Sequence, residues 1–193
     1  MSLVETKSDL LKDLNISDSF TPEVLEAVTA GESRYLRDLR INLKNALGSD
    51  NLTPREAYLI ALSIAANQNN KLLSESFAHY AAENGASAAD IAEAYSCASM
   101  LAVNNVLYRF RHFVKKDSYQ NMPAGIKMNV MMSPVLGKEL FELISLAVSA
   151  VNGCEVCVTS HEASLRKLET TEQRIFDAVR LASVVKGLTV IIN

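Results

Sequence analysis

The sequence contains few residues that interrupt helices. Only four prolines and seven glycines occur among the 193 residues, which also contain no tryptophan. Long stretches rich in alanine, leucine and glutamate lie between these interruptions, and such residues favour helix. A chain of this length with 49% hydrophobic residues also has enough apolar material for a substantial core. We therefore expect an all-α protein and no strand.

Long apolar runs are also missing. No segment reaches the ~18 consecutive apolar residues that indicate a transmembrane helix. The first residues, MSLVETKSDLLKDL, contain acidic side chains and no apolar core of the kind found in secretory signals. From these features we expect a cytoplasmic protein.

Charge and cysteine content exclude two further classes. The net charge is −3, with acidic and basic residues mixed along the chain, so no basic surface for nucleic acid is expected. Three cysteines are too few for a scaffold held by disulfides. In a cytoplasmic chain, a close cysteine pair indicates catalysis or metal binding more often than a structural bridge.

The pattern of residues predicts about eight helices. Thr21 and Thr53 each precede a proline, which is a helix-start signature. The segment 88–113 is predicted to break near Asn104–Asn105, and the final GLTVIIN fits either frayed helix or strand. The expected helices are 3–14, 23–30 continuing as 33–46 past a possible boundary at Gly31, one from Pro54, 71–84, 88–113, two after Gly137, and 171–185.

Two parts of the chain resemble each other. EAYLIALSIAANQNNKLLSE aligns with ELISLAVSAVNGCEVCVTSH at an offset of 86, and IAEAYSCAS aligns with IFDAVRLAS at an offset of 84. This predicts a single domain, 1–193, with two related helical halves, 1–114 and 135–193, joined by a connector, 115–134. At the offset of 86, the first half has Gln68, Lys71 and Glu75 where the second has Cys154, Cys157 and His161.

The stretch NGCEVCVTSH contains the candidate reactive residues, two cysteines and a histidine. A helix starting after Asn152–Gly153 places Cys154 in its first turn, where unpaired N–H groups and the helix dipole favour a thiolate. Cys157 follows at i+3 and His161 four residues later, so all three share one helix face. An imidazole one turn from a thiol can accept its proton.

Glu142 is the candidate partner of the histidine. On one straight helix it would lie ~18 Å from Cys154. Asn152–Gly153, however, is a strong chain-reversal signal, and a helix hairpin there would bring Glu142 alongside His161. A carboxylate against one ring nitrogen would fix the tautomer of the imidazole.

The residues alone leave other interpretations open. A structural zinc site needs four ligands, whereas this stretch supplies three and the other histidines, His79 and His112, lie far away in sequence. A permanent disulfide would close a very small loop and add little stability. An inert pair of core cysteines also fits, because free cysteine is often buried. Cys97 lies in an apolar segment with no nearby base and is expected in the core.

The segment FELISLAVSAVNGCEVCVTSHEASLRK strongly resembles the alkyl hydroperoxidase D (AhpD) family, within the wider carboxymuconolactone-decarboxylase-like group. NNVLYRFRHF (104–113) and AGIKMNV (124–130) resemble the middle of that family. The resemblance implies an all-helical fold of two related halves and a homotrimer. It also implies a thiol-dependent peroxidase and reductant of a peroxiredoxin, with no bound cofactor and with lipoyl (dihydrolipoamide) groups of a carrier protein as electron donor.

The resemblance also implies residue roles. Cys157 would be deprotonated through His161, Glu142 would polarise His161, and Cys154 would complete the disulfide. The family pattern has a histidine directly before the second cysteine, whereas this chain has Val156, which cannot relay a proton. This difference puts peroxidase efficiency and the identity of the reducing partner in question.

Two other functions compete with the peroxidase. The chain could be a non-catalytic helical oligomeric interaction module whose cysteines are inert or only sense oxidants. The non-redox lactone chemistry of the wider group is a third interpretation, although that chemistry has no need of two adjacent thiols.

Overall fold

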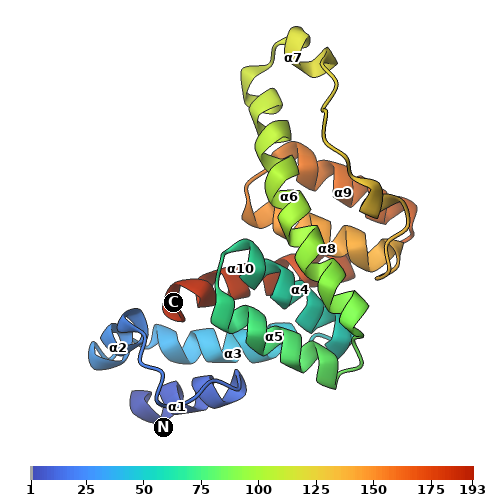
Figure 1. Ribbon diagram of the computed structural model, residues 1–193. Helices are drawn as coiled ribbons and strands as arrows, with labels where there is room; N and C mark the ends of the chain where they lie inside the picture. Colours follow the sequence, from blue (N-terminus) through green and yellow to red (C-terminus); the bar gives the residue numbers. More distant parts are fainter. Residues whose placement is uncertain (1) are drawn as a thin grey trace.

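The computed structural model describes residues 2–193, which form ten α-helices and one short 3₁₀ helix with no strand in that range (Figure 1). The all-α expectation is therefore confirmed, although the predicted number of helices was too low. The helices are α1 (Leu3–Asp13), α2 (Glu23–Ala30), α3 (Tyr35–Leu47), α4 (Pro54–Asn67), α5 (Lys71–Glu83), α6 (Ala88–Val114), α7 (Asp117–Asn121), η1 (Asn129–Met132), α8 (Lys138–Val151), α9 (Glu155–Lys167) and α10 (Glu172–Ile191).

Helix α4 lies at the centre of the molecule. It packs against α5, α6, α8 and α10, and eight of its nine positions from Ala57 to Ala65 are buried, Tyr58 being the exception. Its start matches the sequence signature, because the Thr53 side chain accepts a hydrogen bond from the Glu56 N–H while the Glu56 carboxylate accepts one from Thr53 N–H. Helix α8 packs against α4, α6, α9 and α10, and is buried along ten consecutive residues, 140–149.

Helices α1 to α3 lie at one end of the molecule, where α3 packs against α1 and α10 (Figure 1). The start of α2 differs from the prediction. Pro22, and not Thr21, is the N-cap residue, and no side chain caps this helix. A proline fits at the start of a helix because it has no N–H to leave unpaired.

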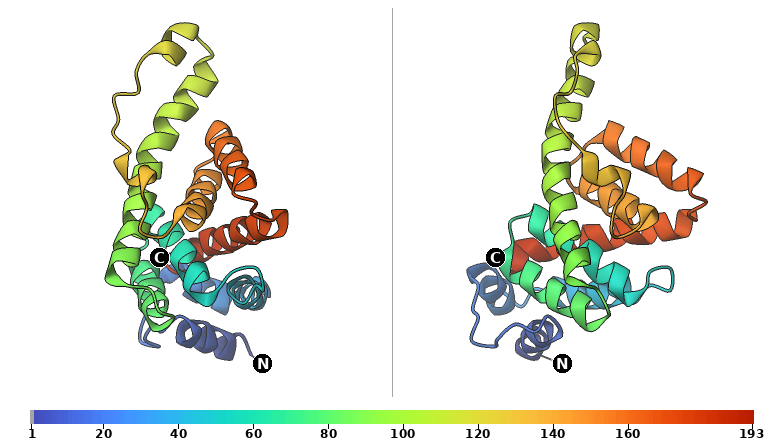
Figure 2. Two further views of the ribbon diagram at one scale, coloured as in Figure 1. Left: turned by 90° about the vertical axis from the view of Figure 1, so that its right-hand side faces the viewer. Right: turned by 45° about the vertical axis from the view of Figure 1, so that its right-hand side comes forward.

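Helix α6 is continuous from Ala88 to Val114, so the predicted break at Asn104–Asn105 is wrong. Asparagine side chains disturb a helix when they bond to its own backbone. Here both side chains bond to other segments instead, Asn104 to Met128 and Asn105 to Ser149. The far end of α6, together with α7, projects beyond the other helices in Figure 1 and in both views of Figure 2, and the connector then returns to η1 beside α8. The C-terminal tail is also helical, since α10 runs to Ile191.

The helix bounds reveal the register of the duplication. Helices α4, α5 and α6 begin at residues 54, 71 and 88, and α8, α9 and α10 begin 84 residues later in each case, at 138, 155 and 172. This constant offset replaces the offset of 86 inferred from the first sequence match. Glu142 therefore corresponds to Tyr58, Cys154 to Asn70, Cys157 to Leu73 and His161 to Phe77.

Candidate active site

The two cysteines and the histidine lie on helix α9, and the glutamate lies on α8. Helix α8 ends at Val151, Asn152 caps it, and Gly153 adopts the left-handed conformation at φ +67°. A residue with a Cβ rarely adopts this conformation, so glycine suits the turn. The chain then reverses, with Cys154 N–H donating to the Ser149 carbonyl at 3.0 Å. The reversal places α9 alongside α8, as the Asn–Gly signal predicts.

Cys154 is the N-cap residue of α9 and therefore sits one position before the first turn in which it was expected. Its carbonyl accepts a hydrogen bond from Val158 N–H at 2.9 Å. Cys154 and Cys157 are joined by a disulfide, with their Cα atoms 5.3 Å apart. Cys154 is fully buried, whereas Cys157 is 7% exposed.

His161 and Glu142 are in direct contact. The Nδ1 atom of His161 lies 2.7 Å from Oε2 of Glu142, and both side chains are buried. A carboxylate accepts hydrogen bonds but donates none, so the proton in this contact belongs to Nδ1 of the ring. The other ring nitrogen, Nε2, is then left with a free lone pair.

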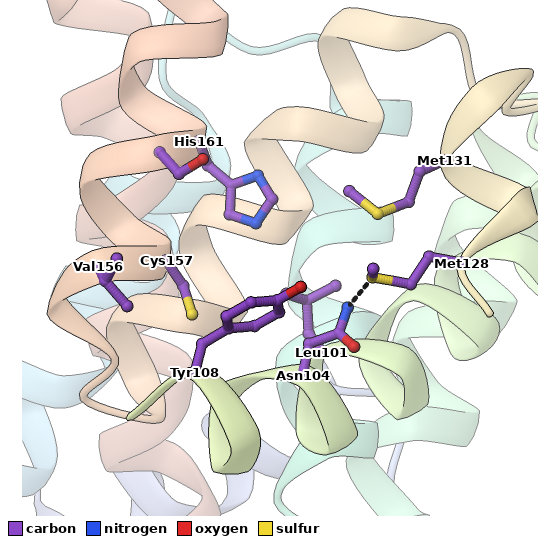
Figure 3. Close-up of a pocket in the computed structure, with 9 residues that line it drawn as sticks. Leu101, Asn104, Tyr108, Met128, Met131, Val156, Cys157 and His161 are labelled. Atoms are coloured by element: carbon purple, nitrogen blue, oxygen red, sulfur yellow. Dashed lines mark hydrogen bonds between the residues drawn. The ribbon is translucent and has the colours of Figure 1, made fainter. Parts of the chain in front are cut away.

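A cavity of about 310 Å³ lies between the α9 residues Cys157 and His161 on one side and α6 and the connector on the other (Figure 3). Cys157 and His161 lie on one wall, and side chains from α6 and from the segment around η1 form the rest. Cys154 is not part of the lining. The lining residues are Leu101, Asn104, Tyr108, Met128, Met131, Val156, Cys157, Ser160 and His161.

Helix α6 also fastens the turn that precedes the cysteines. Asn105 donates a hydrogen bond to the Ser149 hydroxyl at 3.0 Å and accepts one from the Asn152 side chain at 2.8 Å. Arg109 donates to the Asn152 carbonyl at 2.5 Å. These contacts hold the α8–α9 turn against α6, and thereby fix where α9 starts.

The remaining candidates from the sequence lie elsewhere. Cys97 is buried beside Ser145, with Sγ and Oγ 3.5 Å apart, and burial raises the pKa of its thiol to about 12, which makes it inert at neutral pH. His79 pairs with Glu83, and His112 pairs with Glu155 at 3.3 Å. Within residues 2–193, no three His, Cys, Asp or Glu side chains are arranged to hold a metal ion.

The sequence did not predict the α6 residues of the cavity wall opposite Cys157. It also did not predict the clamp, by which we mean the contacts of Asn105 and Arg109 with the α8–α9 turn. Tyr108, Asn105 and Arg109 all lie in the NNVLYRFRHF stretch, which predicted a helix break and a family resemblance but no site residue. The pair of asparagines inside an apolar helix was the sequence signal for these contacts, because buried side-chain amides need hydrogen-bond partners in another segment.

Fold and site together define an all-α protein with a cysteine pair beside a histidine–glutamate pair. The carboxymuconolactone decarboxylase family model matches residues 118–192. A protein named alkyl hydroperoxide reductase AhpD from Anaeromyxobacter dehalogenans (strain 2CP-C) is 41% identical over 167 residues, which are 86% of this chain and 89% of that relative.

Proteins of the same name from Brucella anthropi and Bradyrhizobium sp. are also similar. The first is 40% identical over 158 residues, covering 81% of this chain and 89% of the relative. The second is 37% identical over 159 residues, covering 82% of this chain and 87% of the relative. This chain belongs to the AhpD family. In residues 2–193, no helix is long and apolar enough to cross a bilayer.

Proposed function

We propose that this protein is a thiol-dependent alkyl hydroperoxide reductase that works through a dithiol–disulfide cycle of Cys154 and Cys157. The observation that carries the proposal is the 2.7 Å contact between Glu142 and His161, with His161 lining the same cavity as Cys157. The printed name of the relatives, alkyl hydroperoxide reductase, supports the same activity.

In this proposal His161 is the base for the thiol. With its Nδ1 proton held by Glu142, the ring takes the thiol proton at Nε2, and the carboxylate stabilises the imidazolium that forms. The pair is buried, so water competes little with these contacts.

Cys157 is the thiol that attacks the peroxide. It lines the cavity and is four residues from His161, whereas Cys154 is fully buried behind it. The Cys157 thiolate attacks the terminal oxygen of the hydroperoxide, the O–O bond breaks, and an alcohol and a sulfenic acid form. The Cys154 thiol then condenses with the sulfenic acid, which releases water and forms the disulfide.

The cycle needs a reductant. We propose lipoyl (dihydrolipoamide) groups of a carrier protein as the electron donor, and a peroxiredoxin as a disulfide-bearing partner that the reduced form regenerates. Both reactions pass through a mixed disulfide. The second lipoyl thiol resolves it when the carrier reduces the Cys154–Cys157 disulfide, and the second cysteine of this protein resolves it when the protein reduces the peroxiredoxin. The site would act in the cytoplasm, where cysteines are otherwise kept reduced.

We also propose a homotrimer. Apolar side chains are exposed along α6 and in the segment between α6 and α8, and exposed apolar surface commonly marks protein interfaces. They are Val103, Val106, Phe110, Phe113, Met122, Met132 and Val135. The same apolar surface favours the second candidate function, an oligomeric interaction module with inert or oxidant-sensing cysteines.

A coupled turnover assay separates the two functions. The reduced protein is given an organic hydroperoxide with a lipoylated carrier and its reductase, and turnover is followed through the reductase. The peroxidase proposal requires turnover in the wild type and in Cys97→Ser, and its loss in Cys154→Ser and Cys157→Ser. A stable oligomer with no turnover with any dithiol donor would establish the interaction module instead.

A further inference from the structure

The wall of the cavity that faces Cys157 belongs to α6, and Tyr108 contributes the hydroxyl group of that wall. Its side chain lies among the lining residues with Cys157 and His161 beyond it on α9 (Figure 3). Within residues 2–193 the Tyr108 hydroxyl has no hydrogen-bond partner. The guanidinium carbon of Arg111 lies 5.7 Å from the centroid of the Tyr108 ring, and this cation–π contact helps to fix the ring.

The other polar residue of that wall, Asn104, is held through one of its side-chain N–H groups. The Asn104 side-chain nitrogen donates to the Met128 sulfur at 3.0 Å (Figure 3). Thioether sulfur only accepts hydrogen bonds, so one N–H of the amide faces Met128, and the buried Asn104 Oδ1, which has no partner, can only accept. Among the α6 residues that line the cavity, Tyr108 is therefore the one that offers a hydroxyl donor, and this O–H has no competing partner.

Peroxide reduction needs such a donor. When a thiolate attacks one oxygen of the O–O bond, negative charge develops on the other oxygen, which leaves as an alkoxide. A hydrogen-bond donor aimed at developing charge lowers the barrier, and in a site shielded from water the effect is large. Val156, the residue directly before Cys157, has no proton to offer.

Resting on the proposed function, we propose that Tyr108 is a further catalytic residue, whose phenol O–H donates a hydrogen bond to the leaving oxygen of an organic hydroperoxide. The Cys157 thiolate bonds to the terminal oxygen as the O–O bond breaks, and the electron pair of that bond goes to the oxygen bound by Tyr108. The proton that converts the alkoxide to the alcohol is the one that His161 removed from the thiol. The sum is thiol plus hydroperoxide giving sulfenic acid plus alcohol.

The rest of the cavity suits the organic part of such a substrate. Leu101, Met128 and Met131 surround the space next to the phenol, and methionine side chains adapt to varied apolar shapes. The proposed substrate class is therefore a hydroperoxide with a bulky apolar group.

The test compares two oxidants on the reduced full-length protein. The first is cumene hydroperoxide, whose alkoxide leaves poorly without a donor. The second is a nitrobenzoate disulfide, whose thiolate leaves readily without a proton. For Tyr108→Phe we expect thiol oxidation by cumene hydroperoxide to slow by about 100-fold. The rate with the aromatic disulfide should stay within about twofold, because the thiolate itself is unchanged.

The control is Tyr119→Phe, which makes the same substitution on α7, outside the cavity lining. Equal slowing with both oxidants in Tyr108→Phe would assign Tyr108 a structural role and overturn the inference. Unchanged cumene hydroperoxide reduction in that variant would overturn it as well, while leaving the proposed function intact. If the wild type reacts with the disulfide but with no hydroperoxide, the proposed function fails, and the role of Tyr108 fails with it.

Discussion

The carboxylate of Glu142 lies 2.7 Å from Nδ1 of His161, at the positions where the first half of the protein has Tyr58 and Phe77. Those two rings also face each other, with centroids 6.5 Å apart. The duplicated helix hairpin thus brings the same two positions together in both halves. In the first half the contact is aromatic packing, and in the second it is a hydrogen-bonded pair next to a disulfide.

The first prediction concerns Glu142→Gln. A glutamine can offer either its oxygen or its NH₂ group, so it no longer enforces the proton on Nδ1 of His161. We expect the rate of thiol oxidation by hydroperoxide to fall by about 10- to 100-fold, with the largest loss near neutral pH. Stopped-flow thiol oxidation as a function of pH measures this.

Glu139→Gln is the matched control, since Glu139 lies on the same helix but pairs with Arg174 and does not line the cavity. It should retain the wild-type pH profile. A wild-type profile in Glu142→Gln would remove the carboxylate from the mechanism.

The second prediction separates the roles of the two cysteines. With Cys154→Ser, the sulfenic acid on Cys157 has no thiol to condense with and should accumulate after one equivalent of peroxide. With Cys157→Ser, no sulfenic acid should form. Trapping with a dione reagent followed by mass spectrometry measures both. If Cys154 carries the adduct in Cys157→Ser, at the rate found for Cys157 in Cys154→Ser, the assignment of the attacking thiol is reversed.

The third prediction concerns the clamp on the turn. Asn105→Ala removes hydrogen bonds to Ser149 and Asn152 and leaves a fully buried hydroxyl without its donor. We expect the free energy of unfolding to fall by about 1–3 kcal/mol. Urea unfolding measures it, with Val106→Ala, at an exposed neighbouring position, as the control. A loss in Asn105→Ala no greater than in the control would show that the clamp adds nothing to stability.

The fourth prediction concerns acid stability. Burial alone would raise the pKa of Glu56, but hydrogen bonds from Arg174 and Thr53 outweigh burial and hold the pKa below its ordinary value. A carboxyl whose pKa is lower in the folded state stabilises the fold above its unfolded pKa, about 4.3. That contribution is lost as the pH falls through the folded pKa.

Glu56→Gln should therefore lower stability near neutral pH and make the loss of stability between about pH 5 and pH 3 smaller than in the wild type. Urea unfolding across that range measures the difference. Glu75→Gln is the control, because Glu75 belongs to an exposed pair with Lys71. If the free energy of unfolding of Glu56→Gln changed with pH as steeply as that of the wild type, the argument would be contradicted.

The site contact was predictable from sequence because its signals are local. Cys157 and His161 share a helix face by spacing, and the Asn152–Gly153 turn is the reversal that brings Glu142 to them. Each inference needed only residues within twenty positions of one another. The repeat was visible as well, but its register became clear only from the helix bounds, because alanine-rich helices align nearly as well at neighbouring offsets.

The opposite wall was not predictable, since it depends on contacts between distant segments. Asn105 bonds to Ser149, 44 residues away, and this bond lets α6 continue where the sequence favoured a break. Tyr108 carries no local sign of facing the cysteines, which lie more than forty residues further along the chain. Such residues are identified by packing and not by spacing.

The account as a whole is tested by the stoichiometry of one reaction. Fully reduced wild-type protein is mixed with a limiting amount of cumene hydroperoxide without any donor, and the alcohol formed and the thiols lost are both counted. We predict two thiols lost and one disulfide, Cys154–Cys157, formed for each molecule of alcohol. Hydroperoxide left unreacted, or alcohol formed at the same rate by Cys157→Ser, would contradict it.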